Sequence, residues 1–312
     1  MKVLFVFSGN HGKNEIVNNQ ANSLISCGIE VVLFPIMGKG LWGYLANLGV
    51  LRKISKKVDL VHAHFSLAGF LATLSLIGTK KKVICSLMGS DILNEGLLFS
   101  TLVRFFSIFF WDYTIVKSKE MLLKLHNYKN AQIVPNGVDI DKFYPIDKSL
   151  ARSTLGLKQD AMYLIFPSNP ARLEKNYKLF NATVEALRQK GFNVQTICYK
   201  GIPNDQLFYY YSAADLLLFT SYYEGSPNVI KEAMACNCPI VSTDVGDVKE
   251  IINKTLQCKV VNFDIDQIID SCSEILSINS RSNGRINIHP YESAKIAVEI
   301  SRIYFKCINA KI

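Results

Sequence analysis

The clearest chemical pattern in this sequence is a pair of glutamates with seven residues between them. Glu224 lies in the turn after an expected strand at 216–220, and Glu232 lies on a helix expected at 228–235. The first turn of that helix offers unpaired backbone N–H groups and the positive end of its dipole, which suit a phosphate. An ionised carboxylate accepts from two hydroxyls at once, which suits a sugar or a ribose diol. The alternative is a capping acid followed by a solvated helix acid.

A basic segment follows the strand expected at 163–166. It contains Arg172 and Lys175, and Lys178 stands three residues further on. Fixed cations at such a position stabilise the negative charge of a departing diphosphate. The segment therefore predicts a diphosphate site, and the alternative is a turn with two solvated cations.

Three polar segments follow strands in the first half of the chain, at 8–12, 62–65 and 88–91. The glycines in them allow a backbone to approach a ligand closely. His62 and His64 would share one face of a strand, but two histidines without a third ligand make a thin metal site. We expect one histidine to be a polar core residue and the other to lie in the cleft. The candidates that these segments contribute are Gly9, Asn10, His64, Met88 and Asp91.

Short apolar runs alternate with longer amphipathic ones, which predicts βαβ units and parallel sheets. The alternation pauses at 135–157, a Pro-, Gly- and Asp-containing stretch that we interpret as a linker. We expect two Rossmann-like domains, at 1–145 and 146–289, and a helix in 290–312 that crosses back to the first. The expected strands are 3–7, 31–35, 60–63, 82–87, 113–116 and 132–134, then 163–166, 194–199, 216–220, 240–243 and 259–261.

The composition is that of a folded, basic protein. Of the 312 residues, 49% are hydrophobic and 20% charged, which excludes disorder, collagen and coiled coil. The net charge is +9, and residues 1–150 hold 17 Lys and Arg against 10 Asp and Glu. This excess favours an anionic partner for the first half, such as a phospholipid surface, a diphosphate or nucleic acid. The alternative is a basic enzyme without such a partner.

The cysteines and the apolar segments predict the compartment. Eight scattered cysteines without a Cys-x-x-Cys pair predict reduced thiols and a cytoplasmic protein. The run at 3–7 is too short for a secretory signal, and the stretch at 97–111 is shorter than the ~20 residues that span a bilayer. The segment 41–57 joins apolar and aromatic residues to a basic cluster, which suits an anionic lipid surface. The alternative is a core-packed helix with a solvated basic end.

Taken together, the motifs resemble the retaining glycosyltransferases of family 4, which have the GT-B fold. The resemblance covers nearly the whole chain and implies an α/β protein, with two Rossmann-like domains whose parallel sheets face each other across a cleft. The matching residues are Glu224 and Glu232 with Ala233, Met234 and Ala235, then Pro239, Ile240, Val241, Val245 and Gly246, the segment 135–139 with Phe143 and Pro145, and the segment 172–176.

The resemblance also implies roles for individual residues. Glu224 would contact the hydroxyls of the donor sugar, Glu232 would hold the ribose, and the two cations would bind the diphosphate. The family has no uncontested nucleophile, so none is assigned, and it works without a metal. The implied catalytic residues are Glu224, Arg172 and Lys175; the donor-binding residues are Gly9, Gly225, Ser226, Asn228 and Glu232; the acceptor or sugar side has Asn10, His64, Met88 and Asp91.

Three departures from the family pattern affect this assignment. Met88 stands where the family often has a histidine that touches the donor sugar, which leads to the hypothesis of a less polar donor, such as a 6-deoxy or N-acetylated sugar. The basic loop is shorter than usual, so Lys178 is an alternative to Lys175. The first loop reads Ser8, Gly9, Asn10 rather than a double glycine.

The expected function is retaining transfer of a hexosyl or N-acetylhexosaminyl group. The donor would be a nucleotide diphosphate-sugar and the acceptor a glycan or polyprenyl-linked glycan of surface polysaccharide biosynthesis (capsule, O-antigen, lipopolysaccharide or exopolysaccharide). The protein would be cytoplasmic, with peripheral attachment to the inner face of the membrane as a further hypothesis. The alternatives are a nucleotide-sugar 2-epimerase of the same fold and a non-catalytic sugar-nucleotide-binding protein. Nucleic acid is not expected, because the glutamate pair would repel phosphate and no nucleic-acid motif is present.

Overall fold

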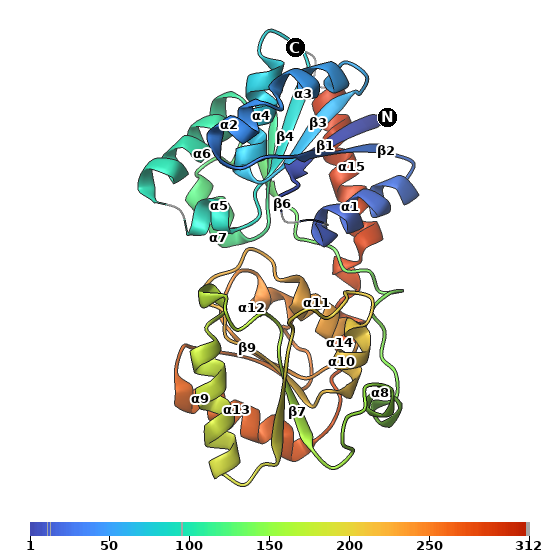
Figure 1. The fold of residues 1–312 in the computed structure, drawn as a ribbon, viewed down its shortest axis with the longest axis vertical. Coiled ribbons are helices and arrows are strands. Elements are labelled where there is room, and N and C mark those ends of the chain that lie inside the picture. The colour runs from blue at the N-terminus through green and yellow to red at the C-terminus, as the bar shows by residue number, and fades with distance from the viewer. Residues whose placement is uncertain (11, 13, 95, 310–312) are drawn as a thin grey trace. The chain divides into compact units, whose positions relative to one another are not determined.

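The computed structural model describes residues 1–10, 12, 14–94 and 96–309, and the chain forms two compact units (Figure 1). Unit 1 consists of Met1–Gly137 and Ser293–Ile312, and unit 2 is Val138–Glu292. The boundary expected after residue 145 lies eight residues later than the observed one, and the boundary expected after residue 289 lies three residues earlier. In Figure 1 the red C-terminal helix lies among the blue and green elements of unit 1.

Unit 1 contains a six-stranded sheet in the order β2-β1-β3-β4-β5-β6. Every pair of neighbouring strands is parallel, as the βαβ pattern predicts. Each strand end lies within one residue of its expected position. The strands are β1 (Lys2–Ser8), β2 (Glu30–Ile36), β3 (Leu60–His64), β4 (Lys82–Ser86), β5 (Tyr113–Val116) and β6 (Ala131–Ile133).

Helices cover both faces of this sheet because successive side chains of a strand point to opposite sides. Leu4 and Val6 belong to the core shared with α3, α4, α6 and α7, whereas Val3 and Phe5 belong to the core shared with α1 and α15. The helices are α1 (Glu15–Ser26), α2 (Gly40–Leu45), α3 (Leu48–Ser55), α4 (Ser66–Leu76), α5 (Ser90–Leu93), α6 (Leu97–Phe109), α7 (Lys119–Leu125) and α15 (Ser293–Asn309). None of the helices in the described ranges has the length and apolar character needed to cross a membrane.

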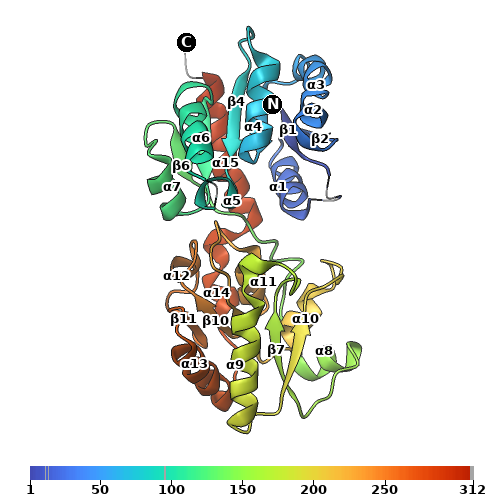
Figure 2. The same ribbon diagram turned by 60° about the vertical axis from the view of Figure 1, so that its left-hand side comes forward.

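Unit 2 contains a five-stranded parallel sheet in the order β11-β10-β9-β7-β8. Helices α9 and α13 pack side by side on one face (Figure 2), and α10, α11 and α12 cover the other. The strands are β7 (Met162–Phe166), β8 (Val194–Cys198), β9 (Leu216–Phe219), β10 (Ile240–Thr243) and β11 (Cys258–Val261). The helices are α9 (Tyr177–Gln189), α10 (Leu207–Ala213), α11 (Asn228–Ala235), α12 (Val248–Ile251), α13 (Ile265–Ile278) and α14 (Gly284–Asn287), with 3-10 turns at Leu173–Lys175 and His289–Tyr291.

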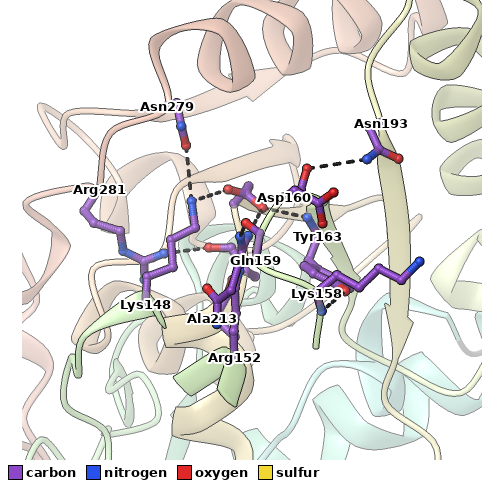
Figure 3. Close-up of polar contacts among 12 residues, drawn as sticks. Lys148, Arg152, Lys158, Gln159, Asp160, Tyr163, Asn193, Ala213, Asn279 and Arg281 are labelled. Atoms are coloured by element: carbon purple, nitrogen blue, oxygen red, sulfur yellow. Dashed lines mark hydrogen bonds and ion pairs between the residues drawn. The ribbon is translucent and has the colours of Figure 1, made fainter. Parts of the chain in front are cut away.

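The prediction of a linker at 135–157 is wrong, because this stretch contains helix α8 (Lys148–Thr154). The Asp147 side chain caps this helix by accepting from the backbone N–H of Leu150 at 2.9 Å. Charged contacts hold α8 on unit 2, since Lys148 and Arg152, both labelled in Figure 3, bond to Asp215, the residue before β9. A helix attached by cations shows little apolar periodicity, so the sequence pattern did not reveal it.

The Asp215 carboxylate is the centre of this network. Its Oδ2 accepts from Arg152 Nη2 and from the backbone N–H of Tyr163, each at 2.6 Å, and its Oδ1 accepts from Lys148 Nζ. Arg152 also donates to the carbonyls of Ala213 and Gln159 at 3.1 and 2.7 Å. Asp215 and Arg152 are buried, so their charges depend on their partners, whereas Lys148 is partly exposed.

Asp215→Ala should therefore lower the free energy of unfolding by about 3–5 kcal/mol, because it leaves a buried guanidinium and a lysine without their counter-ion. Denaturant unfolding of the full chain measures this. The matched control is Asp270→Ala, which removes an exposed ion pair with Lys190 and should change stability by less than about 1 kcal/mol. Equal midpoints for the two variants would show that the network contributes nothing.

Candidate functional site

Unit 2 gathers candidate residues at the carboxyl ends of three neighbouring strands. Lys175 follows β7, Glu224 follows β9, and Asp247 follows β10. In a parallel sheet these ends lie along one edge, which is where open α/β sheets bind ligands. Residues separated by more than 70 positions therefore share a single edge.

A partly buried ion pair joins Lys175 and Glu224. Lys175 Nζ donates to Glu224 Oε1, and the two side chains are 14% and 16% exposed. The loops that carry them are also bonded, because Thr220 Oγ1 donates to the carbonyl of Lys175 at 3.0 Å and the N–H of Tyr222 donates to the carbonyl of Glu174 at 3.0 Å. The site thus holds one cation beside one carboxylate in a fixed geometry.

The other two predicted cations are exposed and, in the described part of the chain, form no bond to this pair. Arg172 is exposed, and its Nε donates to Glu174 Oε1 at 2.7 Å. Lys178 is exposed on the first turn of α9. The structure therefore brings Lys175, rather than Arg172 or Lys178, into contact with Glu224.

Glu232 is buried on α11 and is oriented by a phenol. Tyr211 Oη donates to Glu232 Oε2 at 2.8 Å. Burial raises the pKa of Tyr211 well above its ordinary value, and the nearby Glu232 charge acts in the same direction. The phenol therefore stays protonated at neutral pH and remains a hydrogen-bond donor to the carboxylate.

The turn that carries Glu224 is fixed by a chain of buried polar groups. Lys231 Nζ donates to Ser226 Oγ at 2.5 Å, and Ser226 Oγ donates to Asp247 Oδ2 at 2.5 Å. Gly246, at a φ of +61°, brings the second loop so close that a Cβ there would lie 2.7 Å from the carbonyl oxygen of Gly225. Burial lowers the pKa of Lys231 and raises that of Asp247.

Lys231→Met should lower the free energy of unfolding by about 2 kcal/mol or more, because Ser226 and Asp247 then lose a buried charged partner. It should also loosen the turn that carries Glu224. Thermal unfolding of the full chain measures the first effect. Lys249→Met, which removes an exposed lysine, is the control and should leave the melting temperature unchanged. A variant as stable as the wild type would mean that the chain of polar groups holds nothing in place.

Buried acceptors at this edge lack partners in the described part of the chain. They are Asn228 Oδ1, on the first residue of α11, Asp247 Oδ1 and Ser221 Oγ. Buried polar atoms in folded proteins are nearly always paired, so each unpaired one needs an explanation. A ligand that donates hydroxyl or N–H groups to this edge would provide one.

Unit 1 has a pocket of about 550 Å³ at the carboxyl ends of its strands. His64 and Asp91 line it together with aromatic side chains from α2 and α6, Tyr44 and Phe99. His64 is buried, and neither of its ring nitrogens has a hydrogen-bond partner among the described residues. Burial, with a smaller contribution from Lys117, lowers the pKa of His64 to about 3, so a neutral imidazole faces this pocket.

Asp91 is fixed at the pocket by backbone donors. The N–H groups of Met88 and Gly89 donate to its Oδ1 at 3.0 Å, and that of Ser66 donates to its Oδ2 at 3.2 Å. Burial raises the pKa of Asp91 to about 6, although these hydrogen bonds act in the opposite direction. Asp91 is therefore an ionised acceptor at neutral pH, and Met88 takes part through its backbone.

The remaining predicted residues of unit 1 bond within the chain. A Cβ on Gly9 would lie 2.7 Å from Met37 Sδ and from Pro35 Cβ, so packing against the end of β2 already requires a glycine there. Asn10 donates to the carbonyl of Gly38 at 2.7 Å and accepts from its N–H at 3.0 Å. Both residues hold the first loop against the loop after β2.

The two histidines of β3 divide as the sequence interpretation expected. His62 is the core residue, bonded to Tyr304 Oη at 2.6 Å and to Ser86 Oγ at 2.8 Å, and His64 is the one that lines a pocket. Among the described residues, no group of three or more His, Cys, Asp and Glu side chains forms a metal-binding cluster.

Comparison with known families supplies the identity. A family model described as Glycosyltransferase Family 4 matches residues 4–142, and one described as Glycosyl transferases group 1 matches residues 161–277. Together they cover most of both units. The chain belongs to glycosyltransferase family 4.

Several relatives of this family 4 chain have assigned names. A Bacillus subtilis protein, provisionally assigned as the teichuronic acid biosynthesis glycosyltransferase TuaC, is 28% identical over 63% of this chain and 56% of its own length. The N-acetyl-alpha-D-glucosaminyl L-malate synthase of Bacillus anthracis is 23% identical over 81% of this chain and 76% of that protein. The match to TuaC thus spans only about half of that relative.

Solved structures share the GT-B fold of the family. Sucrose-phosphate synthase from Thermosynechococcus elongatus superposes with a TM-score of 0.78 at 17% identity, covering 99% of both chains. HepE from Anabaena, solved in complex with UDP-glucose, superposes with a TM-score of 0.73 at 16% identity, covering 97% of this chain and 99% of that one. These likenesses establish the fold as GT-B, as expected.

Sequence reasoning missed Lys231, Asp247 and Tyr211 at the site of this family 4 member. Asp247 follows β10 at the same sheet edge as Glu224, so the strand-end rule that found the other candidates could have found it. Lys231 and Tyr211 carry no such signal. A lysine and a tyrosine on helices usually face solvent, and only the packing shows that these two are buried.

Proposed function

We propose that this family 4 protein is a retaining glycosyltransferase that moves a hexosyl or N-acetylhexosaminyl group from a nucleotide diphosphate-sugar to a glycan or polyprenyl-linked acceptor. The observation that carries the proposal is the partly buried Lys175–Glu224 ion pair, together with the buried Glu232 carboxylate on α11, the helix that follows the loop of Glu224. A cation for a diphosphate and two carboxylates for hydroxyl groups match the chemistry of such a donor.

The donor would bind along this edge of unit 2. Glu232, held by Tyr211, would accept from the two ribose hydroxyls, and Lys175 would neutralise the diphosphate, with the more exposed Arg172 reaching it from the same loop. The unpaired acceptors Asn228 Oδ1 and Asp247 Oδ1 would receive donor hydroxyl or N–H groups. The complex of HepE with UDP-glucose supports a nucleotide sugar as the donor.

The chemistry would depend on charge and orientation rather than on a covalent intermediate. The bond between the anomeric carbon and the diphosphate oxygen breaks, and the acceptor oxygen bonds to that carbon on the same face. The acceptor proton passes to the departing phosphate. Lys175 stabilises the charge on the diphosphate, Glu224 orients the sugar hydroxyls, and neither role requires a metal.

The acceptor would bind in the pocket of unit 1. The neutral His64 can donate from one ring nitrogen and accept at the other, and Asp91 accepts at its rim, so both can bind sugar hydroxyls. The aromatic side chains Tyr44 and Phe99 offer apolar faces to a sugar ring. Asn10 and Met88 belong to loops that end at this sheet edge.

The acceptor class proposed is a membrane-linked glycan of surface polysaccharide synthesis on the cytoplasmic side. The similarity to a protein assigned to teichuronic acid biosynthesis supports a cell-surface polymer. We also propose that Met88, in the place of the family's histidine, favours a 6-deoxy or N-acetylated donor sugar. Equal turnover of a hexose donor and its 6-deoxy analogue would contradict that specificity.

A panel of nucleotide sugars tests the proposed function. The full chain is incubated with each donor and with polyprenyl-linked glycans, and released nucleoside diphosphate and product linkage are measured by chromatography and NMR. Transfer with an unchanged anomeric configuration is the expected result. A 2-epimer without transfer would identify an epimerase, and donor binding without either product would identify a binding protein.

A further inference from the structure

Helix α6 of unit 1 is apolar on its outer face as well as on its inner face. Val103 is buried together with Ser100 and Ser107, and Leu98 and Phe109 are 89% and 68% exposed. The exposed side chains of α6 also include Leu97, Leu102, Phe105 and Ile108. A helix on the surface of a water-soluble domain normally directs polar residues outward. This exposed apolar surface indicates that the outer face of α6 contacts something other than water.

The exposed apolar surface continues onto the neighbouring helices. Phe70 of α4 packs on Phe99 and Phe106 of α6, and α4 in turn exposes Leu67 and Leu74. Helix α2 exposes two more apolar side chains, among them Trp42 at 82%. In Figure 1, α2, α3, α4 and α6 lie next to one another on the same side of the sheet. The outer surface of these four helices is called the apolar face below.

The charge on the apolar face is mainly positive, although Asp59 lies among the cations at one end of it. Helices α2, α3, α4 and α6 contain no Asp or Glu. Cations stand at one end, where α3 runs into Lys56 and Lys57 and α4 is followed by Lys80 and Lys81. Arg52 connects the two helix ends, because its Nη1 donates to the carbonyls of Ser75 and Ile77 at 2.9 Å.

We infer that the apolar face docks on an anionic phospholipid surface. Exposed leucines and aromatic residues enter the interfacial region of a bilayer, and lysines beside them are attracted to anionic headgroups. A second copy of the chain is disfavoured, because pairing this face with itself would bring like charges together. A protein partner is disfavoured because protein–protein interfaces are depleted in lysine, whereas the apolar face has several lysines at one end.

The apolar face reaches the pocket of unit 1, since Phe99 of α6 and Tyr44 of α2 line it. A docked protein would therefore have this pocket beside the membrane surface, where a lipid-linked glycan is found. This last point rests on the proposed function, whereas the docking itself does not.

Flotation of the full chain with vesicles tests the inference. The wild type should float with equimolar phosphatidylglycerol and phosphatidylcholine, float poorly with phosphatidylcholine alone, and lose binding as salt rises. Replacing Lys53, Lys56 and Lys57 by serine should reduce partitioning on anionic vesicles by about tenfold or more. Arg52 is kept, because it bonds the end of α4.

Two matched double variants test whether the apolar face is the surface that docks on the vesicles. Leu98→Glu with Phe109→Glu should abolish flotation, whereas Val298→Glu with Phe305→Glu, on exposed positions of α15, should leave it unchanged. Thermal melts check that each variant folds. If the variant with Leu98→Glu and Phe109→Glu does not fold, the lysine variant tests the inference. A protein that does not float but still shows a nucleotide-induced thermal shift would contradict docking and leave the proposed function standing.

Three outcomes would overturn the inference. One is a wild-type protein that does not float with anionic vesicles. Another is equal flotation of the wild type, the lysine variant and the variant with Leu98→Glu and Phe109→Glu. The third is light scattering in which Leu98→Glu with Phe109→Glu converts a dimer into a monomer, because the face would then bind a second copy.

Discussion

Glu224→Gln should reduce the turnover number about 100- to 1,000-fold while the protein stays folded, because it removes the charged group that we propose contacts the reacting sugar. In the structure this carboxylate accepts from Lys175 Nζ in a pair that is mostly buried. The amide keeps the shape of the side chain but loses its charge, so Lys175 loses its partner and the sugar hydroxyls lose an anionic acceptor. Steady-state transfer with the donor found in the nucleotide-sugar panel measures the effect.

The control for this variant is Glu185→Gln, which changes an exposed carboxylate on α9 that pairs with Arg188. It should retain wild-type turnover, since exposed ion pairs contribute little. If Glu224→Gln and Glu185→Gln transfer sugar at the same rate, Glu224 has no part in the chemistry. Lys175→Met should resemble Glu224→Gln, because each removes one half of the same pair.

Glu232→Gln should weaken binding of the nucleoside diphosphate by about 10- to 100-fold, because the amide cannot accept two ribose hydroxyls as a carboxylate does. The variant keeps the volume of the buried side chain, so the unliganded protein should melt close to the wild type. The measurement is the thermal shift that each nucleoside diphosphate produces, compared between variant and wild type.

Tyr211→Phe separates binding by Glu232 from its positioning. It removes the 2.8 Å hydrogen bond that orients the carboxylate and leaves the charge in place. We expect a smaller loss of nucleotide affinity than with Glu232→Gln. A full thermal shift in Glu232→Gln would exclude the ribose role for this residue, and the donor would then bind elsewhere on unit 2.

The sequence predicted the two sheets nearly residue by residue. Their strands are short apolar runs between turn residues, and the chain alternates them with helices, so local patterning was enough. The polar groups at the strand ends could be predicted as well, because parallel strands end at a common edge. Thus the sequence places Lys175, Glu224, His64 and Asp91 at or after the ends of strands, and the structure has them there.

Other parts of the site could not be predicted because they depend on partners far along the chain. Lys231 looks like a solvated helix lysine until Ser226 and Asp247 are seen around it. Helix α8 looks like a linker until Asp215, more than 60 residues away, is seen to hold its cations. Burial of a charge is stable only with a partner, and the sequence does not show which partner will be near.

The apolar face of unit 1 shows the same limit most clearly. The sequence of α6 is apolar on nearly every side, so its periodicity does not tell which side is buried. Only the packing of α6 on α4 and β5 shows that serines face inward and that Leu98 and Phe109 face outward. Local sequence thus determined the strands, most of the helices and the sheet edge at which the candidate residues lie. The tertiary structure decided which charges are paired and which apolar side chains remain exposed, because both depend on contacts between residues distant in the chain.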